Sequence, residues 1–300
     1  MGNAACARYC GGRAASSVVL VANQSFLVTG ASSGIGRACV NDLAAKGARV
    51  WATVRTDDDE KALKKDHPDA VTVLRVDLAD SDSVIAAGER VCAAGPLNGL
   101  VNNAAWAVPA PLELTPVDHF RRQVEVSLIG QFAMTRAMLP ALRQARAAGQ
   151  PARIIMIGSV GDRIARPMFG AYCAAKFGLV GLSDTLRAEL APSGIAVALV
   201  EPGAIATPIW DRGLVETADL VNQAPAEDRA RYERHITAFL DMCAKMPTQG
   251  SPPEQVAAVV TQALTGRRPR ARYLVGKQAR MAATIASLPS GVRYALAARL

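Results

Sequence analysis

The segment Thr29-Gly30-Ala31-Ser32-Ser33-Gly34-Ile35-Gly36-Arg37 follows a short apolar run and precedes a helical pattern that extends from Ile35 to Lys46. Glycines at such a turn allow a tight backbone path, so that N–H groups can approach a phosphate at the positive end of the helix. A plain strand-to-helix turn would hardly need three glycines. We therefore predict a nucleotide-binding turn, formed by Gly30, Ser32, Ser33, Gly34, Ile35 and Gly36.

The same strand-then-helix order repeats along the chain. Short β-branched or apolar runs predict strands at 25–29, 49–54, 71–76, 99–102, 153–157, 195–200 and 273–275. Helical patterns lie between them, at 35–46, 58–65, 83–94, 117–147, 171–191 and 253–264. Strands separated by helices must cross over and pair in parallel. We expect a single α/β domain with a doubly wound parallel sheet of about seven strands.

The alternation of predicted strands and helices also indicates boundaries within the chain. Residues 1–24 are rich in Ala, Gly and Ser and are expected to form a flexible N-terminal arm. Residues 25–276 would form the domain, and 203–250 would be an insertion, irregular to helical, that serves as a lid or a binding loop. Residues 277–300 are expected to be a basic C-terminal helical extension.

The composition is that of an ordinary globular chain. Its 300 residues are 50% hydrophobic and 20% charged, which excludes a disordered or collagen-like protein. The six cysteines have no metal-like spacing and the three histidines lie far apart, so we expect no metal site. Reduced thiols in a reducing compartment are the default, and we expect a cytoplasmic protein.

The formal net charge of +8 comes entirely from the C-terminal part of the chain. After Glu254 there is no acidic residue, while eight basic residues follow: Arg267, Arg268, Arg270, Arg272, Lys277, Arg280, Arg293 and Arg299. Few aromatic residues lie among them, so nucleic acid is not the expected partner. Apolar residues among these arginines make weak contact with an anionic membrane surface an alternative to a helix that covers the flank of the domain.

The glycine segment has two competing interpretations. A P-loop is excluded because no Gly-Lys-Ser or Gly-Lys-Thr occurs there. Residues 30–34 also match the nucleophile elbow G-x-S-x-G, so a serine hydrolase is a remote alternative. That elbow normally follows several earlier strands, one of whose loops supplies oxyanion donors, whereas here it follows the first. Nucleotide binding is therefore favoured.

The end of the second strand bears on the choice of nucleotide. Folds that prefer NAD usually have Asp or Glu there to accept hydrogen bonds from the adenosine ribose, whereas arginine suits a 2′-phosphate. Here the residues are Val54 and Arg55. Arg55 therefore predicts NADP(H), while Arg37 is more simply a surface arginine.

A candidate catalytic group follows the fifth strand. Ser159 lies at its carboxyl end, and thirteen residues later Tyr172 and Lys176 begin a helix. A spacing of four puts the phenol and the ammonium on one helix face. A phenol has a pKa near 10, and a neighbouring cation would favour its phenolate. Ser159 and Tyr172 would then bind the substrate oxygen.

The sequence resembles the short-chain dehydrogenase/reductase family over nearly all of residues 25–276, in the style of the retinol and hydroxysteroid dehydrogenases. The matching motifs are TGASSGIG, Asp77-Leu78, VNNAA at 101–105, Gly158-Ser159, Tyr172-x-x-x-Lys176 and EPGAIATP at 201–208, all in the family's order. The resemblance implies a Rossmann-type fold. It also implies Tyr172 as catalytic acid or base, Ser159 as anchor of the substrate oxygen, and Lys176 as pKa modulator and ribose ligand.

The same resemblance implies further cofactor contacts. Asp77 and Leu78 would hold the adenine, and Asn103 and Ala104 would flank the nucleoside. In the segment from Pro202 and Gly203 to Thr207, Ile205 and Thr207 would hold the carboxamide.

Two positions depart from the family pattern. Ala105 stands where Gly is usual, which is a modest steric change. Ser127 stands where the family usually has an Asn that links the lysine to solvent through water, so the resemblance makes Ser127 the candidate for that relay. Because serine is shorter and has one donor, the relay would need an additional water or would be impaired.

These observations predict an NADP(H)-dependent oxidoreductase that interconverts an alcohol and a ketone or aldehyde, with no metal. Apolar residues in the insertion favour a lipophilic substrate of steroid, retinoid or fatty aldehyde type. The resemblance implies a homo-oligomer, since the helices that contain Ser127 and Tyr172 commonly pair between subunits in this family. A catalytically weak NADP-binding sensor or scaffold is the alternative.

Overall fold

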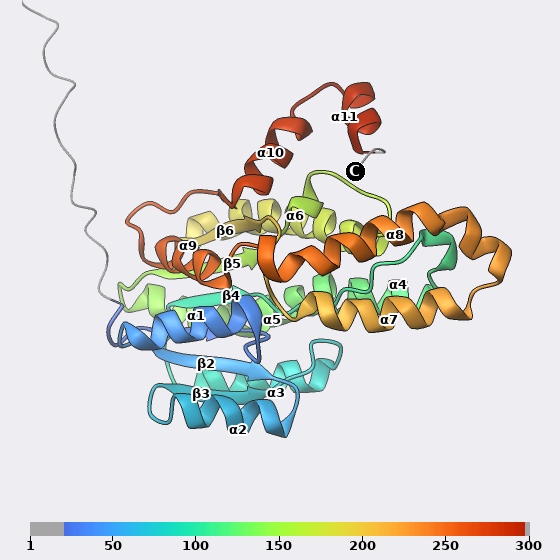
Figure 1. Cartoon of the computed structure of the whole chain (residues 1–300). Coiled ribbons are helices and arrows are strands. Elements are labelled where there is room, and N and C mark those ends of the chain that lie inside the picture. Colours follow the sequence, from blue (N-terminus) through green and yellow to red (C-terminus); the bar gives the residue numbers. More distant parts are fainter. Residues whose placement is uncertain (1–20, 298–300) are drawn as a thin grey trace, which may run out of the picture.

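Seven parallel strands form the centre of the computed structural model, which describes residues 21–297 apart from the side chains of residues 212, 294 and 297 (Figure 1). The strands are β1 (Ser25–Val28), β2 (Arg49–Val54), β3 (Val71–Arg75), β4 (Gly99–Asn102), β5 (Ala152–Ile157), β6 (Ile195–Pro202) and β7 (Arg272–Val275). Their order in the sheet is β3-β2-β1-β4-β5-β6-β7, and every pair is parallel. The predicted doubly wound α/β fold is confirmed.

Helices cover both faces of the sheet. On one face, α1 (Gly34–Ala45), α2 (Asp57–Asp66) and α9 (Pro253–Thr265) pack into a core that includes Leu43, Leu63 and Val260. On the other face, α3 (Ser81–Ala93), α5 (Gly130–Ala147) and α6 (Gly170–Leu190) bury Val91, Met138 and Leu186. Burial on both faces explains why the central strands are apolar throughout rather than alternating.

The strand order reverses between β1 and β4, the neighbouring strands from which the chain proceeds in opposite directions. Ligands of such sheets bind outside the carboxyl ends of the strands at this switch point. The glycine segment follows β1, and Asn103 follows β4, so both lie at this edge of the sheet.

The helix expected at 117–147 is not uniform. It consists of α4 (Val117–Val124), a π-helical turn η2 (Glu125–Ile129) and α5. Two local contacts accompany the wide turn: Ser127 bonds to the backbone of Trp106, and Gly130 packs so closely on Leu78 that a Cβ there would lie 2.6 Å from the Leu78 Cβ. Sequence periodicity alone did not show this interruption, because a π turn inserts a single residue into the pattern.

The insertion forms two helices, α7 (Ile209–Gln223) and α8 (Ala226–Gln249), which lie side by side at one edge of the domain (Figure 1). Their apolar side chains Trp210 and Phe239 pack against Phe169 at ring-centroid distances of 6.4 and 5.7 Å. The insertion returns to the domain where Ala206 N donates to Ser251 O over 3.0 Å. The pair therefore rests on the segment that precedes α6.

The last two described elements are α10 (Lys277–Ala286) and α11 (Ser290–Ala297), at the top of the view in Figure 1. The first turn of α10 lies against the loop after β6, since a Cβ on Gly203 would be 3.1 Å from the Gln278 Cβ. The predicted N-terminal arm, apart from residues 21–24, lies outside the described residues. Within residues 21–297, no helix has both the length and the hydropathy needed to cross a membrane.

Candidate active site

The glycine turn has the backbone shape that its sequence predicts. Gly30 and Gly34 have φ values of +65° and +57°, a region that residues with a Cβ rarely adopt. Gly36 has a different role, because a Cβ there would lie 2.6 Å from the Asn103 amide nitrogen and even closer to the carbonyl oxygen of Gly30. The first two glycines shape the turn, and the third lets α1 approach it.

The start of α1 faces the same space. Its first backbone N–H groups have no partner within the helix, and there is no acidic residue in its first turn. The helix dipole adds partial positive charge at this end. An anionic group such as a pyrophosphate fits this end of the helix.

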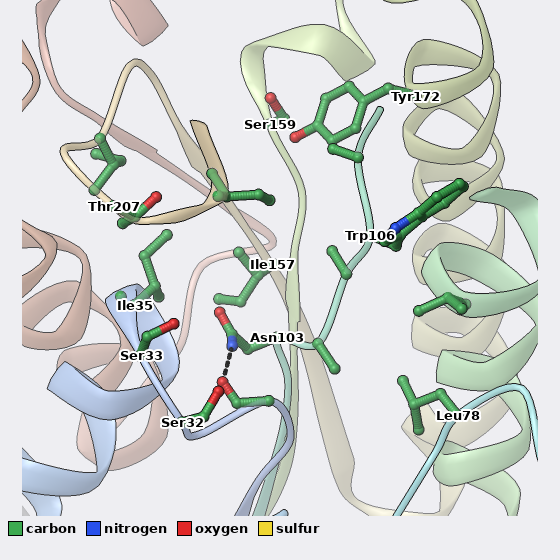
Figure 2. Close-up of a pocket in the computed structure, with 18 of the residues that line it drawn as sticks. Ser32, Ser33, Ile35, Leu78, Asn103, Trp106, Ile157, Ser159, Tyr172 and Thr207 are labelled. Atoms are coloured by element: carbon green, nitrogen blue, oxygen red, sulfur yellow. Dashed lines mark hydrogen bonds between the residues drawn. The ribbon is translucent and has the colours of Figure 1, made fainter. Parts of the chain in front are cut away.

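Two side chains fasten the turn to β4. Thr29 Oγ1 accepts hydrogen bonds from the backbone N–H groups of Asn103 and Ala104, over 2.9 and 3.0 Å. The Asn103 amide donates to the carbonyl oxygens of Thr29 and Gly30, over 2.9 and 3.1 Å, the second of which is visible in Figure 2. In this structure the Asn103 side chain thus holds the glycine turn in place.

A cavity of about 310 Å³ extends from Arg55 to Tyr172 along the carboxyl edge of the sheet. Every residue predicted to bind the cofactor lines it except Gly36: Gly30, Ser32, Ser33, Gly34, Ile35, Arg55, Asp77, Leu78, Asn103, Ala104, Tyr172, Lys176, Pro202, Gly203, Ile205 and Thr207. The long shape, the glycine turn and the free helix end fit a dinucleotide. Sequence reasoning did not anticipate Trp106 and Arg122, which also line it and stack with 5.5 Å between the guanidinium carbon and the ring centroid.

The two arginines considered for a ribose phosphate have different surroundings. Arg37 forms an ion pair with Asp66, which agrees with a surface role. Arg55 is exposed at the rim of the cavity, and no hydrogen bond or ion pair joins its side chain to another of the described residues. Its guanidinium is therefore available to a ligand.

Ser159, Tyr172 and Lys176 meet at the other end of the cavity. Figure 2 shows the hydroxyl groups of Ser159 and Tyr172 close together. The Lys176 ammonium lies 5.8 Å from the centroid of the Tyr172 ring and donates a hydrogen bond of 2.7 Å to the carbonyl oxygen of Ile157. The spacing of four residues thus brings the amine beside the phenol, as expected for one helix face.

Burial is the largest influence on the charge state of the Tyr172 phenol. Burial raises the pKa of Tyr172 to about 12, while its hydrogen bond with Ser159 and the charge of Arg166 act in the opposite direction. Burial also lowers the pKa of Lys176 to about 8. In the protein alone Tyr172 is therefore a neutral phenol, and Arg166 is a cation that favours its phenolate. That Lys176 favours the phenolate stays a prediction for the site with its cofactor bound.

Ser127 does not reach the cavity. It is fully buried in the π turn, where its hydroxyl donates to the carbonyl oxygen of Trp106 over 3.2 Å. The Ser127 hydroxyl oxygen in turn accepts hydrogen bonds from the backbone N–H of Trp106 and from the side-chain amide of Gln123, over 3.2 and 2.8 Å. These contacts occupy the hydroxyl, so Ser127 holds the loop after β4 and is not placed to relay a proton from Lys176.

A buried ionic network that sequence reasoning missed lies directly behind Ser159. Asp162 accepts a hydrogen bond of 3.1 Å from the backbone N–H of Ser159. Glu201, which is fully buried, forms two hydrogen bonds each with Arg163 and Arg272. Burial and the adjacent Glu201 raise the pKa of Asp162 to about 7. No motif pointed to this network, because its members are brought together only by the pairing of β6 with both β5 and β7.

A second cavity, of about 270 Å³, adjoins the first at Ser159 and Tyr172. Its walls are mostly apolar and come from the loop before α6 and from the two insertion helices, among them Val160, Phe169, Ile209, Trp210, Phe239, Met242 and Met246. Gln278, from the segment predicted as a separate extension, also lines it. A carbonyl compound seated here would have its oxygen beside the two hydroxyl groups.

A model of the short chain dehydrogenase family matches residues 24–214, nearly two thirds of the chain. The protein belongs to this family. The 3-amino-tetrahydro-pyrrolizinone reductase of Xenorhabdus hominickii is 40% identical over 223 residues, 72% of this chain and 74% of its own. The NADPH-dependent 3-dehydrocapnine reductase of Ornithobacterium rhinotracheale is 32% identical, with 83% and 87% covered.

The predicted likeness to retinol dehydrogenases is also confirmed. Mouse retinol dehydrogenase 5 is 34% identical over 273 residues, 87% of this chain and 84% of its own. Among solved structures, a short-chain dehydrogenase from Streptomyces avermitilis has a TM-score of 0.73 and 28% identity, covering 87% and 91% of the two chains. The family and the absence of a histidine among the described residues of either cavity count against the serine hydrolase alternative.

Proposed function

We propose that this short-chain dehydrogenase reduces a ketone or aldehyde with NADPH, and that Tyr172 donates the proton. The observation that carries the proposal is the meeting of two cavities at Ser159 and Tyr172: one has the shape and polar lining for a dinucleotide, and the other is largely apolar. The relatives named as reductases support this direction of reaction.

Ser159, Tyr172 and Lys176 each have a separate role in this reaction. A dihydronicotinamide held in the first cavity would supply the hydride that the carbonyl carbon takes up. Ser159 donates a hydrogen bond to the carbonyl oxygen, and Tyr172, a neutral phenol whose pKa is raised to about 12, holds the proton that this oxygen takes up. Lys176, whose pKa is lowered to about 8, is still mostly protonated at pH 7 and keeps positive charge beside the phenolate that remains.

The preference for NADP(H) rests on the residues at the end of β2. Val54 is buried and has no side-chain acceptor for a ribose hydroxyl, whereas the guanidinium of Arg55 lies at the cavity rim without a partner among the described residues. A planar guanidinium binds phosphate through two parallel hydrogen bonds. The NADPH-dependent relative agrees with this assignment.

The substrate class follows from the walls of the second cavity. Aromatic and aliphatic side chains such as Phe169, Trp210 and Phe239 favour a lipophilic molecule. Steroids, retinoids and fatty aldehydes are the candidate substrates. A relative named as a retinol dehydrogenase supports a substrate of this lipophilic class.

The replacement Tyr172→Phe tests the function. It removes the proton donor and keeps the ring, so the turnover number for the best carbonyl substrate should fall about a hundredfold or more, while NADPH still binds. NADPH oxidation is measured at 340 nm over a panel of lipophilic ketones and aldehydes, and Tyr232→Phe, on α8 and outside both cavities, is the control.

Unchanged turnover in Tyr172→Phe would refute this mechanism. If the wild-type protein binds NADPH but reduces nothing across the panel, the alternative of an NADP-binding sensor or scaffold is favoured instead. NADPH fluorescence enhancement on binding separates these two outcomes.

A further inference from the structure

The second cavity contains one charge. Among the described residues that line it, Arg166 is the only one with an ionised side chain, and the others are apolar, small or neutral polar. Arg166 belongs to the loop between Ser159 and α6, and it lines the cavity that ends at the catalytic hydroxyl groups.

This cation has no counter-ion among the described residues. The Arg166 guanidinium lies 5.0 Å from the centroid of the Phe169 ring, but no hydrogen bond or ion pair joins it to another described residue. A cation over a ring leaves all five N–H donors of the guanidinium unused. An unpaired and partly buried arginine is costly to the fold, because burial disfavours its charged form and lowers its pKa.

The loop places Arg166 by means of a strained turn. The Phe169 N–H donates to the carbonyl oxygen of Arg166 over 3.2 Å, and Met168 has a φ of +72°, unusual for a residue with a side chain. Met168 in turn accepts a hydrogen bond of 2.8 Å from Ala110 N. Strain of this kind persists where the surrounding structure enforces it, and it clusters at ligand sites.

The guanidinium and the catalytic phenol contact the same aromatic ring. The Phe169 and Tyr172 ring centroids are 6.2 Å apart, and the Arg166 charge favours the phenolate of Tyr172. An anion bound by Arg166 would therefore belong to the same molecule as the carbonyl group held by Tyr172, because both groups face one cavity of about 270 Å³.

We propose that Arg166 is a specificity-determining residue that binds an anionic group of the substrate, so that the protein acts on lipophilic carbonyl compounds bearing a carboxylate or a similar oxyanion. The inference deepens the proposed function and rests on it, since the anion is placed relative to the carbonyl that Tyr172 protonates. Guanidinium and carboxylate match in geometry and pair through two charge-assisted hydrogen bonds. The apolar walls of the cavity would contact the rest of the substrate molecule.

The test uses matched pairs of substrates: medium-chain keto acids that differ in the position of the ketone, and their methyl esters. With NADPH, the wild-type kcat/KM for the best acid should exceed that for its ester about tenfold or more, because only the acid pairs with the cation. In Arg166→Gln this ratio should collapse toward one, and Arg166→Lys, which keeps the charge without the planar fork, should retain part of it.

Arg267→Gln is the matched control, since this arginine is exposed in the loop before β7, at the opposite edge of the sheet. It should leave both the ratio and the turnover unchanged. Thermal unfolding and NADPH binding of Arg166→Gln and Arg166→Lys establish that these variants are folded.

A binding measurement separates this inference from the proposed function. Calorimetric titration of the same acids and esters into the protein with oxidised NADP measures affinity without turnover. Tighter binding of the acid, lost in Arg166→Gln, supports the anion site even if no member of the panel is reduced. Equal binding of acid and ester to the wild type, or an acid-to-ester ratio that survives in Arg166→Gln, overturns the anion site. If the acid and the ester are both reduced in that case, the proposed function still holds.

Discussion

Arg55 is the residue on which the choice between the two nicotinamide cofactors depends. It lies at the cavity rim, and its side chain has no partner among the described residues. Arg55→Asp should weaken NADPH binding about tenfold or more, because the carboxylate repels the phosphate. The same carboxylate accepts a hydrogen bond from a ribose hydroxyl, so the affinity of the variant for NADH should rise toward its affinity for NADPH.

Dissociation constants of both cofactors, from fluorescence titration, check this prediction. Arg37→Asp is the comparison, since Arg37 is paired with Asp66 outside the cavity. An unaltered NADPH-to-NADH ratio in Arg55→Asp would show that the phosphate, if recognised at all, is bound elsewhere.

Asp162 should make the stability of the fold depend on pH. Its pKa is raised from 3.8 to about 7, so between about pH 4 and pH 7 the folded protein holds a proton that the unfolded chain releases. Stability must then fall as pH rises through that window, by an amount on the order of a few kcal/mol. The lowered pKa of Glu201 acts in the opposite sense, but below its ordinary value of 4.5.

Asp162→Asn isolates the effect, because the amide oxygen can still accept from the Ser159 N–H and the amide nitrogen imitates the protonated acid. Urea unfolding at several pH values should show a smaller loss of stability from pH 4 to 7 in the variant than in the wild type. Parallel pH profiles would mean that Asp162 is ionised throughout this range.

At the scale of elements, the glycine turn and α1 depend on close backbone contact. Gly36→Ala would force a methyl group against the Gly30 carbonyl and the Asn103 amide, so it should destabilise the protein by about 2 kcal/mol or more and abolish NADPH binding. Gly181→Ala in α6 is the matched control, with open space around its Cβ position, and should stabilise by up to about 1 kcal/mol.

Thermal and chemical unfolding of both variants measure this contrast. A Gly36→Ala protein as stable as the wild type and still able to bind NADPH would show that α1 can shift away from the turn without loss.

The alternation of short apolar runs with helical patterns was sufficient to predict the seven strands, because consecutive crossovers allow only a parallel sheet covered on both faces. The glycine turn, Arg55 and the Ser159, Tyr172 and Lys176 group could likewise be found, since strand ends and helix spacing locate them. These are properties of local sequence.

What the sequence did not reveal depends on contacts between distant segments. The π turn arises where Ser127 and Gly130 meet the loops after β4 and β3, and the Asp162–Glu201 network arises where the turn after β5 meets β6 and β7. Arg166 has no motif around it, and only the structure shows that it lines the second cavity without an ion-pair partner among the described residues.

At the scale of the whole molecule, apolar side chains remain exposed along the helices that follow β4 and β5. Val117, Ile129, Phe132 and Phe177 have exposed fractions of 40% to 64%. Exposed apolar surface of this kind marks an interaction site. We propose that copies of the chain pair through α4, α5 and α6, as expected for a homo-oligomer.

Light scattering coupled to size exclusion tests the pairing. The wild type should elute as a dimer or tetramer, whereas a double variant with Phe132→Glu and Phe177→Glu should be shifted toward the monomer. Met281→Glu on α10, which is 55% exposed, serves as a control that leaves the oligomer intact. A wild type that is monomeric at micromolar concentration contradicts the proposal.

The two cavities share a wall made by Ala107, Ser159, Tyr172, Gly203, Ile209 and Trp210. Whichever small molecule arrives first becomes part of the surface that the second one meets. Thermodynamic reciprocity then requires each to change the affinity of the other by the same factor. Kinetic schemes for this protein that treat the two occupants as independent would therefore misjudge the order in which they enter and leave.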